Sequence, residues 1–334
     1  MSLEILKKQL SENDISGIYV FTGKEDYLKK FYINKIKTAL RIPEDDAFNY
    51  LSVNAQGLTG LQVDDYCQAA PVFAEKKLLY ISCFDSDEMS ADVADVFKNL
   101  EGNYPDWCVI IVDEQGTEHP VAKNFTFALS ENIEILKVDI PLRNVTELCT
   151  WILRHASAEK INMSKSAAEY LLSVTDNNMY NLSSEMAKLF AASDTVDEAL
   201  IDKMVIKTVD ARIFDLTDAI LACDAAKAME LFGDLYEKNP DTMIMGAIYN
   251  CFTRLYQTAL YSNQGLSKND IAKKMAASPF AVGKNLNQLS RISINELREI
   301  IELCAQADDS LKRFAKDKKM EIEIFILQLI NKLK

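Results

Sequence analysis

The residues of this chain that most resemble a nucleotide-binding site form one short turn, Thr22-Gly23-Lys24-Glu25-Asp26. A phosphate-binding loop needs the pattern G-x-x-x-x-G-K-[ST], because several backbone N–H groups must curl round the phosphates and a hydroxyl must hold Mg²⁺. This turn has one glycine and no Lys-Ser or Lys-Thr pair, and its two carboxylates would repel a nucleotide. We therefore expect no nucleotide here, and no metal or other cofactor elsewhere in the chain.

The elements on either side would place this turn at a junction between a strand and a helix. Residues 17–23 predict a buried strand of apolar and β-branched residues that ends at a glycine, and residues 27–36 predict an amphipathic helix. Strand, tight turn and helix are the layout of a phosphate-binding loop. Such a fold without its phosphate-binding residues suggests a part that is moved by an ATPase and has no ATPase activity of its own.

The alternation of strands and helices continues through the first 140 residues. Further strands are predicted at 47–53, 77–83, 107–112 and 133–138, and further helices at 58–69, 89–100 and 121–129. Strands that alternate with helices in this way predict a parallel sheet with helices on both sides. The first part of the chain is therefore expected to be an α/β domain.

From Pro141 onward the pattern is almost entirely helical. Helices are predicted at 145–156, 164–174, 181–192, 196–208, 213–223, 225–238, 242–262, 267–275, 279–290, 293–315 and 319–334. The hydroxyl groups of Ser164 and Thr195 stand where the N-caps of two of these helices are expected.

Composition and charge exclude several classes of function. The chain has 334 residues, a net charge of −13 and seven scattered cysteines, none in C-x-x-C spacing. The charge argues against tight, unaided binding of nucleic acid. Residues 265–334, however, hold 13 Lys and Arg against nine Asp and Glu, so any contact with a nucleic-acid phosphate backbone is expected in this part of the chain. There is no apolar run of about 18 residues and no signal-peptide pattern. We predict a cytoplasmic protein with reduced thiols and no membrane partner.

Two other groups of residues could do chemistry. The apolar run 109–112, followed by Asp113 and Glu114, resembles a Walker B strand, whose acidic residues hold Mg²⁺ beside a phosphate loop. It is the fourth predicted strand, however, whereas that motif belongs to the third, so we interpret the match as accidental. The two histidines, His119 and His155, lie in different predicted domains, and no motif supplies them with catalytic or metal-binding partners.

A third candidate site is apolar. Pro71 is expected to stop the helix predicted at 58–69, and the large apolar residues Val72 and Phe73 follow it at what should be a domain edge. Phe73 could fold back onto the sheet, or it could be an anchor for an apolar pocket on a partner protein, the usual form of an interface hot spot. The residue types leave both interpretations open. The second predicts that Phe73 is substantially exposed in the free protein, because its ring cannot fill a partner's pocket and its own core.

Five stretches, in this order and spacing, resemble the delta subunit family of the bacterial DNA polymerase III clamp loader. The first is 21–28, where the family has a degenerate x-G-x-E-x-Y-L in place of a phosphate loop, and the second is Val72-Phe73 ahead of 77–81. The others are 182–189, similar to the family's L-x-x-E-x-x-K-L helix, then 213–220, and 307–312, similar to its A-D-x-x-L-K. Val72 departs from the family pattern, since a leucine is common there.

The resemblance implies three domains. They are an AAA+-like α/β domain at 1–140 with a degenerate phosphate loop and no nucleotide site, a helical lid domain at 141–210, and an all-α collar domain at 211–334 for oligomerisation. It further implies that Pro71, Val72 and Phe73 bind the sliding clamp, the beta subunit, whose ring is opened for loading onto primed DNA during replication. The other implied partners are the clamp-loader ATPase subunits, the delta-prime subunit and primed DNA within the complex. The chain would be a non-catalytic subunit of a DNA-directed DNA polymerase holoenzyme, with no ATPase activity of its own.

Two alternatives stay open from the sequence. One is a stand-alone nucleotide hydrolase with an atypical site made of Lys24, Asp113 and Glu114. Measuring ATP binding by the isolated chain would distinguish it. The other is a helical scaffold unrelated to replication, which would not bind a sliding clamp.

Overall fold

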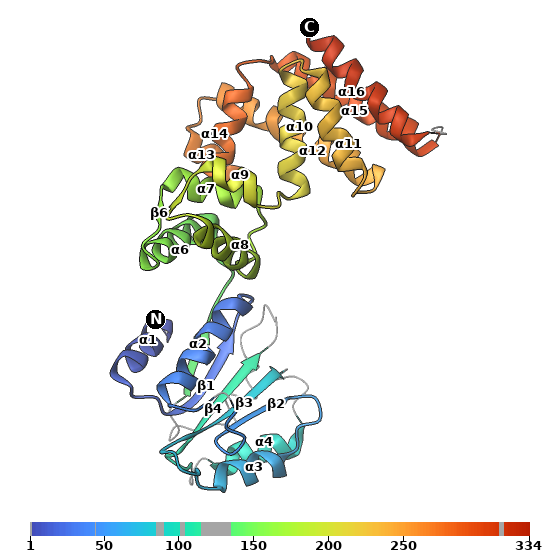
Figure 1. Ribbon diagram of the computed structural model, residues 1–334. Coiled ribbons are helices and arrows are strands. Elements are labelled where there is room, and N and C mark those ends of the chain that lie inside the picture. The colour runs from blue at the N-terminus through green and yellow to red at the C-terminus, as the bar shows by residue number, and fades with distance from the viewer. Residues whose placement is uncertain (1, 44, 85–89, 101–103, 115–134, 314–316) are drawn as a thin grey trace. The chain divides into compact units, whose positions relative to one another are not determined.

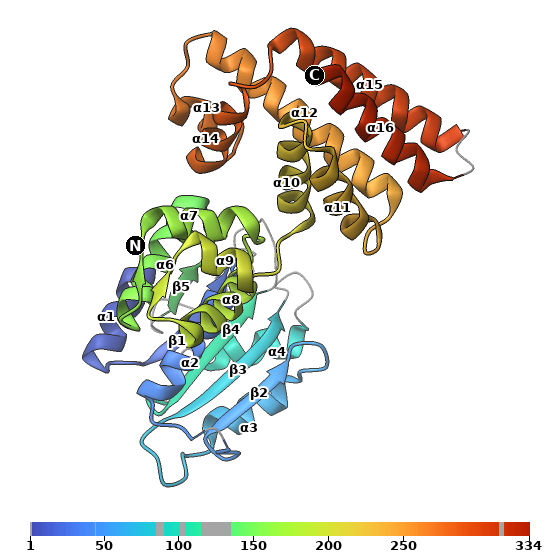
Figure 2. The ribbon, with the colours of Figure 1, turned by 45° about the horizontal axis from the view of Figure 1, so that its top comes forward.

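The chain folds into two compact units, Met1–Arg143 and Asn144–Lys334 (Figures 1 and 2). The structure, a computed structural model, describes residues 2–43, 45–84, 90–100, 104–114, 135–313 and 317–334. The helix predicted at 121–129 and His119 lie outside the described residues. A further boundary near residue 210, between lid and collar, stays a prediction.

The first unit is built on a five-stranded parallel sheet with the strand order β2-β3-β4-β1-β5. Its strands are β1 (Gly17–Thr22), β2 (Tyr50–Asn54), β3 (Lys77–Phe84), β4 (Cys108–Glu114) and β5 (Ile135–Asp139). All six residues of β1 are buried, as are six of the seven in β4. Continuous apolar runs of this kind are typical of parallel strands that are covered on both faces. The predicted α/β fold class with a parallel sheet is confirmed.

Two pairs of helices cover the two faces of this sheet (Figure 2). They are α1 (Ser2–Glu12) and α2 (Asp26–Ala39) on one face, and α3 (Gly60–Gln68) and α4 (Ala91–Asn99) on the other. Tyr19 of β1 belongs to the core with α1 and α2, whereas its neighbour Ile18 belongs to the core with α3 and α4. The chain thus changes face after α2. In open α/β sheets, ligands usually bind in the crevice beyond the carboxyl ends of the strands, at the place where the chain makes such a change of direction.

In its described residues, the second unit is helical apart from a two-residue pairing of β6 (Asn162–Met163) with β7 (Thr195–Val196). Its first helices are α6 (Val145–Ala158), α7 (Lys165–Val174), α8 (Met179–Ala192) and α9 (Glu198–Met204). The helices that follow are α10 (Val209–Leu221), α11 (Ala225–Tyr236), α12 (Asp241–Asn263), α13 (Lys268–Lys274), α14 (Pro279–Gln288), α15 (Ile294–Arg313) and α16 (Lys318–Leu333). The predicted change from α/β to all-helical structure after residue 140 is confirmed.

One of the two predicted N-caps of this unit is wrong. Ser164 caps α7, and its Oγ accepts a hydrogen bond from the backbone N–H of Ala167 at 3.0 Å. Thr195 instead lies in β7, and Asp197 caps α9 by accepting from the N–H of Leu200 at 2.8 Å. The chain enters α9 through a short strand, so the helix begins three residues after Thr195 and ends earlier than predicted.

Helices α10, α11, α12, α15 and α16 share one large apolar core. Its fully buried members include Leu216, Phe232, Phe252 and Leu297. Among the described residues, no helix is both long enough and apolar enough to cross a membrane.

Candidate functional site

The turn between β1 and α2 is closed by the backbone that follows β5. The carbonyl oxygen of Thr22 accepts from the N–H of Ile140 at 2.9 Å, and the N–H of Glu25 donates to the Ile140 carbonyl at 3.2 Å. Gly23 has φ +93°, and a Cβ built on it would lie 2.3 Å from the carbonyl oxygen of Ile140. The glycine is therefore required by a close backbone approach. In a phosphate-binding loop the backbone N–H groups of the turn point at the ligand. Here the N–H of Glu25 is instead bonded to the protein's own backbone.

The two carboxylates of the turn have different surroundings. Glu25 is buried, and that burial raises the pKa of its carboxyl against the lowering effect of a hydrogen bond from the backbone N–H of Tyr27. Asp26 and Lys24 are exposed. Asp26 is 3.0 Å from the ammonium of Lys29, in the first turn of α2.

A lysine that the sequence analysis missed fills the crevice at the carboxyl ends of β1 and β4. Lys29 is 2% exposed, and its Nζ lies 2.9 Å from Asp113 Oδ1 and 3.0 Å from Asp26 Oδ1. It also donates to the backbone carbonyl of Glu114 at 3.2 Å. Burial lowers the pKa of Lys29, but its hydrogen bonds and ion pairs with Asp113 and Asp26 outweigh burial, so the net pKa is raised. An internal cation therefore stands where this fold places ligands.

Asp113 is held on its second oxygen as well. Its Oδ2 accepts from the hydroxyl of Tyr80 on β3 at 2.9 Å, and burial, together with the charge of Asp113, raises the pKa of Tyr80 well above its ordinary value. The structure places Lys29 against Asp113. This geometry speaks against the alternative hydrolase made of Lys24, Asp113 and Glu114, because Asp113 is already bound by two side chains of the protein.

We expect no specific binding of Mg-ATP by the isolated chain. The turn is closed onto Ile140, and the nearest buried cation already has two carboxylates as partners. Isothermal titration calorimetry of the full chain with Mg-ATP measures this directly. Stoichiometric binding tighter than about 1 mM, or −4 kcal/mol, would contradict it.

The apolar candidate site lies at the other edge of the sheet. Residues 69–76 connect α3 to the amino end of β3, whereas the turn 22–26 follows the carboxyl end of β1. In a parallel sheet all amino ends share one edge and all carboxyl ends the opposite edge. Any partner of the 69–76 loop would therefore bind away from the closed turn.

Phe73 is fully exposed on this loop. Its relative exposure is 107%, Val72 is 40% exposed and Pro71 is half-buried. The predicted exposure of Phe73 is confirmed, and the interpretation that it folds back onto the sheet is wrong. A ring without core contacts contributes little to folding and is available for contact with a partner protein.

Two buried polar side chains hold the loop in place. Lys77, at the start of β3, donates to the carbonyl oxygen of Ala69 at 3.0 Å, and its Nζ lies 3.8 Å from the ring centre of Tyr66. Asn49, just before β2, holds the middle of the loop through both backbone polar groups of Val72. Sequence reasoning missed Asn49, because its partner lies 23 residues further along the chain.

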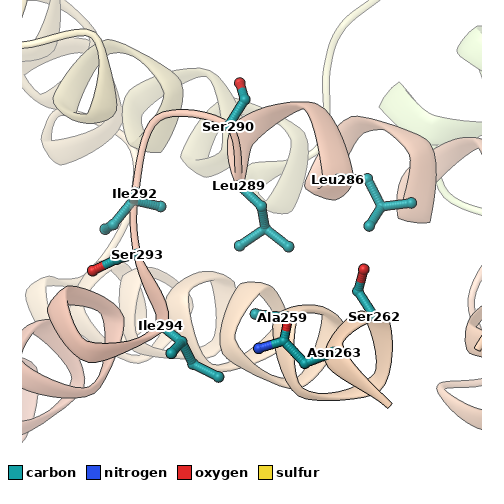
Figure 3. Close-up of a pocket in the computed structure, with 9 residues that line it drawn as sticks. All are labelled: Ala259, Ser262, Asn263, Leu286, Leu289, Ser290, Ile292, Ser293 and Ile294. Atoms are coloured by element: carbon teal, nitrogen blue, oxygen red, sulfur yellow. The ribbon is translucent and has the colours of Figure 1, made fainter. Parts of the chain in front are cut away.

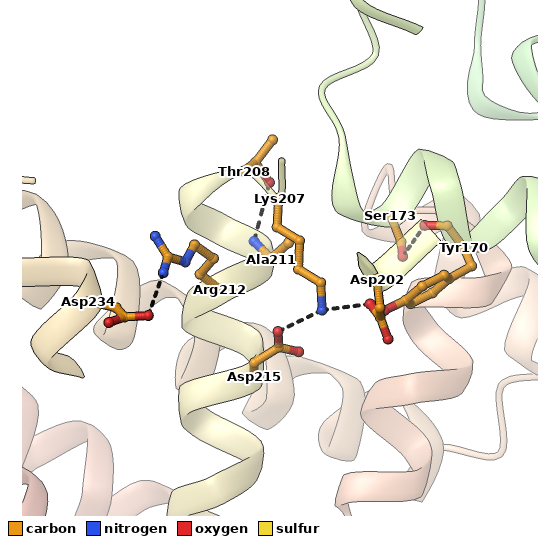
Figure 4. A network of polar contacts seen from close by, with 9 residues as sticks. All are labelled: Tyr170, Ser173, Asp202, Lys207, Thr208, Ala211, Arg212, Asp215 and Asp234. Carbon is orange, nitrogen blue, oxygen red and sulfur yellow. Dashed lines mark hydrogen bonds and ion pairs between the residues drawn. The ribbon is translucent and has the colours of Figure 1, made fainter. Parts of the chain in front are cut away.

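A polar network in the second unit joins α9 and α7 to α10 (Figure 4). The ammonium of Lys207 lies 2.9 Å from both Asp202 and Asp215, and the hydroxyl of Tyr170 donates to Asp202. Burial lowers the pKa of Lys207, but the hydrogen bonds with the two carboxylates outweigh it, and the net pKa is raised. Each of these charges has an opposite charge beside it, so the network serves to hold helices together.

A pocket of about 380 Å³ opens in the second unit between the end of α12 and the connection from α14 to α15 (Figure 3). Leucine and isoleucine residues line it together with Ala259, Asn263, Ser262, Ser290 and Ser293. None of the residues that line it is ionisable. It therefore offers no ionisable side chain for acid–base catalysis.

The first unit has the architecture of a nucleotide-binding α/β domain, but its phosphate-loop turn is closed by its own backbone, and a helical unit follows it. Two family models match the chain: "DNA polymerase III, delta subunit" over residues 19–136 and "DNA polymerase III delta subunit, C-terminal domain" over residues 210–329. The chain belongs to the DNA polymerase III delta subunit family. This membership confirms the resemblance seen in the sequence and removes the alternative of a scaffold unrelated to replication.

A related sequence and a solved structure extend these matches over nearly the whole chain. DNA polymerase III subunit delta of Bacillus subtilis (strain 168) is 23% identical in a match that covers 97% of this chain and 96% of that protein. The solved structure of the Bacillus subtilis DNA clamp loader delta protein covers 99% of this chain and 100% of its own, with a TM-score of 0.56 and 22% identity. The fold of the two chains is shared.

Proposed function

We propose that this protein binds the sliding clamp through Pro71, Val72 and Phe73 and helps open the clamp ring for loading onto primed DNA. Family membership makes the chain a clamp-loader delta subunit. The observation that supports the finer assignment is Phe73, a fully exposed aromatic ring on a loop that buried side chains hold in place. Aromatic side chains that become buried in a partner's pocket on binding dominate the energetics of many protein interfaces.

The proposed mechanism is mechanical. The ring of Phe73 and the smaller side chain of Val72 enter an apolar pocket on one clamp protomer, and binding favours the open form of the ring. Nucleotide is held by other subunits, in keeping with the closed turn of this chain. No residue here needs to make or break a bond.

The helical unit is proposed to assemble with the ATPase and delta-prime subunits of the loader, around primed DNA. Three apolar residues of α16 at helical spacing, Met320, Ile324 and Leu327, are 55, 40 and 46% exposed. Such a stripe on the last helix supports packing against another protein surface.

Phe73→Ala should weaken clamp binding without affecting folding. Loss of a buried aromatic anchor costs about 2 kcal/mol or more, which is roughly thirtyfold in the dissociation constant. Val72→Ala should cost less, since fewer apolar atoms leave the pocket. Surface plasmon resonance with immobilised clamp, together with thermal unfolding of each variant, measures both quantities.

Phe31→Ala is the matched control. Phe31 is also an exposed aromatic residue of the first unit, 44% exposed, but it lies on α2. Its removal should leave clamp affinity unchanged. A well-folded Phe73→Ala protein with normal clamp affinity would overturn the proposed function.

A further inference from the structure

The loop that carries Phe73 is bound at its middle by one side chain from another part of the chain. The N–H of Val72 donates to Asn49 Oδ1 at 2.8 Å, and Asn49 Nδ2 donates to the carbonyl oxygen of Val72 at 2.7 Å. One amide thus pairs with both backbone groups of one residue, as a neighbouring strand would. Asn49 is only 2% exposed, so these bonds are shielded from competing water.

Asp46 fixes the orientation of this amide. Its Oδ2 accepts from Asn49 Nδ2 at 2.8 Å, and its Oδ1 accepts from the backbone N–H of Asn49 at 2.9 Å. These hydrogen bonds lower the pKa of the Asp46 carboxyl. An ionised carboxylate can only accept, so the amide nitrogen must face Asp46 and the amide oxygen must face the N–H of Val72.

The next residue has an unfavourable backbone conformation. Phe73 has φ +54°, in the left-handed region, which a bulky residue seldom adopts and which costs about 1–2 kcal/mol. Its ring is fully exposed and so makes no core contact that could offset this cost. The pairing of Val72 with Asn49 is the contact, directly before Phe73, that holds the backbone in this conformation. Strained residues that the surrounding structure fixes in this way occur mostly at functional sites.

We propose that Asn49, oriented by Asp46, is a positioning residue for clamp binding. It holds Val72 so that the Phe73 ring projects from the loop before the clamp arrives, and the loop need not be ordered on binding. This inference rests on the proposed function, since it assumes that Phe73 enters the clamp's apolar pocket. Without Asn49 only a fraction of the molecules would present the ring correctly, and the apparent affinity would fall to that fraction of its full value.

A double-mutant cycle on the full-length chain tests this proposal. Asn49→Ala, Phe73→Ala and the double variant are compared with the unaltered protein for clamp affinity and for rates of association and dissociation. Asn49→Ala alone should weaken binding about three- to tenfold, the range for ordering one or two side chains. In the Phe73→Ala background the same change should have no further effect, because the ring that Asn49 positions is gone. The loss should lie mainly in the association rate, since fewer molecules are ready to bind.

Asp46→Ala is the second variant, in case the loss of buried Asn49 prevents folding. It keeps the Asn49 amide but removes the group that orients it, and we expect a smaller loss of affinity that also disappears in the Phe73→Ala background. If Phe73→Ala itself leaves binding unchanged, the proposed function fails and this inference fails with it. The inference alone is overturned if Phe73→Ala weakens binding while folded Asn49→Ala does not, or if the two losses simply add. A loss carried only by faster dissociation would make Asn49 a contact residue and would also overturn it.

Discussion

Lys29→Met is expected to lower the free energy of unfolding of the Met1–Arg143 unit by about 3 kcal/mol or more, the range for breaking a buried ion pair. Methionine fills a similar volume but leaves Asp113, whose side chain is only 14% exposed, without its cation. In a Trp151→Phe background Trp107 is the remaining tryptophan of the chain, so its fluorescence follows the unfolding of this unit in denaturant.

Lys30→Met is the matched control, since Lys30 is the next residue of α2 and is exposed. We expect its effect to stay within about 0.5 kcal/mol, as for most surface substitutions. A double variant, Lys29→Met with Asp113→Asn, should recover part of the loss, because no unpaired charge is then buried. Equal effects of Lys29→Met and Lys30→Met would show that the internal ion pair contributes nothing to the fold.

The difference in stability between Lys29→Met and the unaltered protein should also depend on pH in a defined direction. The pKa of Lys29 is raised in the folded protein above its ordinary value of 10.5. A lysine with a raised folded pKa contributes stability that is fully present below its unfolded pKa and is lost as the pH rises through the folded pKa. The difference between the two proteins should therefore be constant near neutral pH and decrease only above about pH 10.

The local pattern of residues was sufficient for most of the elements. The continuous apolar run ending at Val112 predicted a strand buried on both faces, and β4 is such a strand. The residue types around Pro71 left the position of the Phe73 ring open, and only the interpretation as an anchor for a partner's pocket predicted its exposure. Helix α1 was not predicted, although Leu3, Leu6 and Leu10 have helical spacing and all three pack in the core beside α2.

The polar contacts of the candidate site could not be predicted, because they depend on strand order. Lys29 meets Asp113 only because β4 lies next to β1 in the sheet, although two strands separate them along the chain. A signal for Lys29 was nevertheless present, since it shares the buried face of α2 with Ile33 and Ile36. Asn49 gave a weaker signal: an Asp three residues earlier predicts a local turn, but not the bond to Val72.

Gly23→Ala should cost about 3–5 kcal/mol of stability, a size reserved for a few mechanisms that include backbone strain. Two effects add at this position. A side chain is disfavoured at φ +93°, and the new Cβ would lie 2.3 Å from the Ile140 carbonyl oxygen and 2.5 Å from its carbon. Backbone atoms cannot move aside as the end of a flexible side chain can. The turn would have to move away from Ile140 and lose the hydrogen bonds that close it.

Gly57→Ala separates these two effects. Gly57, in the connection from β2 to α3, has φ +92°, almost the same as Gly23, but a Cβ there would meet nothing within 4 Å. Its substitution should cost only the conformational strain, about 1–2 kcal/mol. Denaturant unfolding of both variants, followed by Trp107 fluorescence, gives the two free energies under the same conditions. The excess cost of Gly23→Ala measures how tightly Ile140 closes the turn, and equal costs would mean that the turn opens freely, which would undermine the structural argument against a phosphate site at residues 22–26.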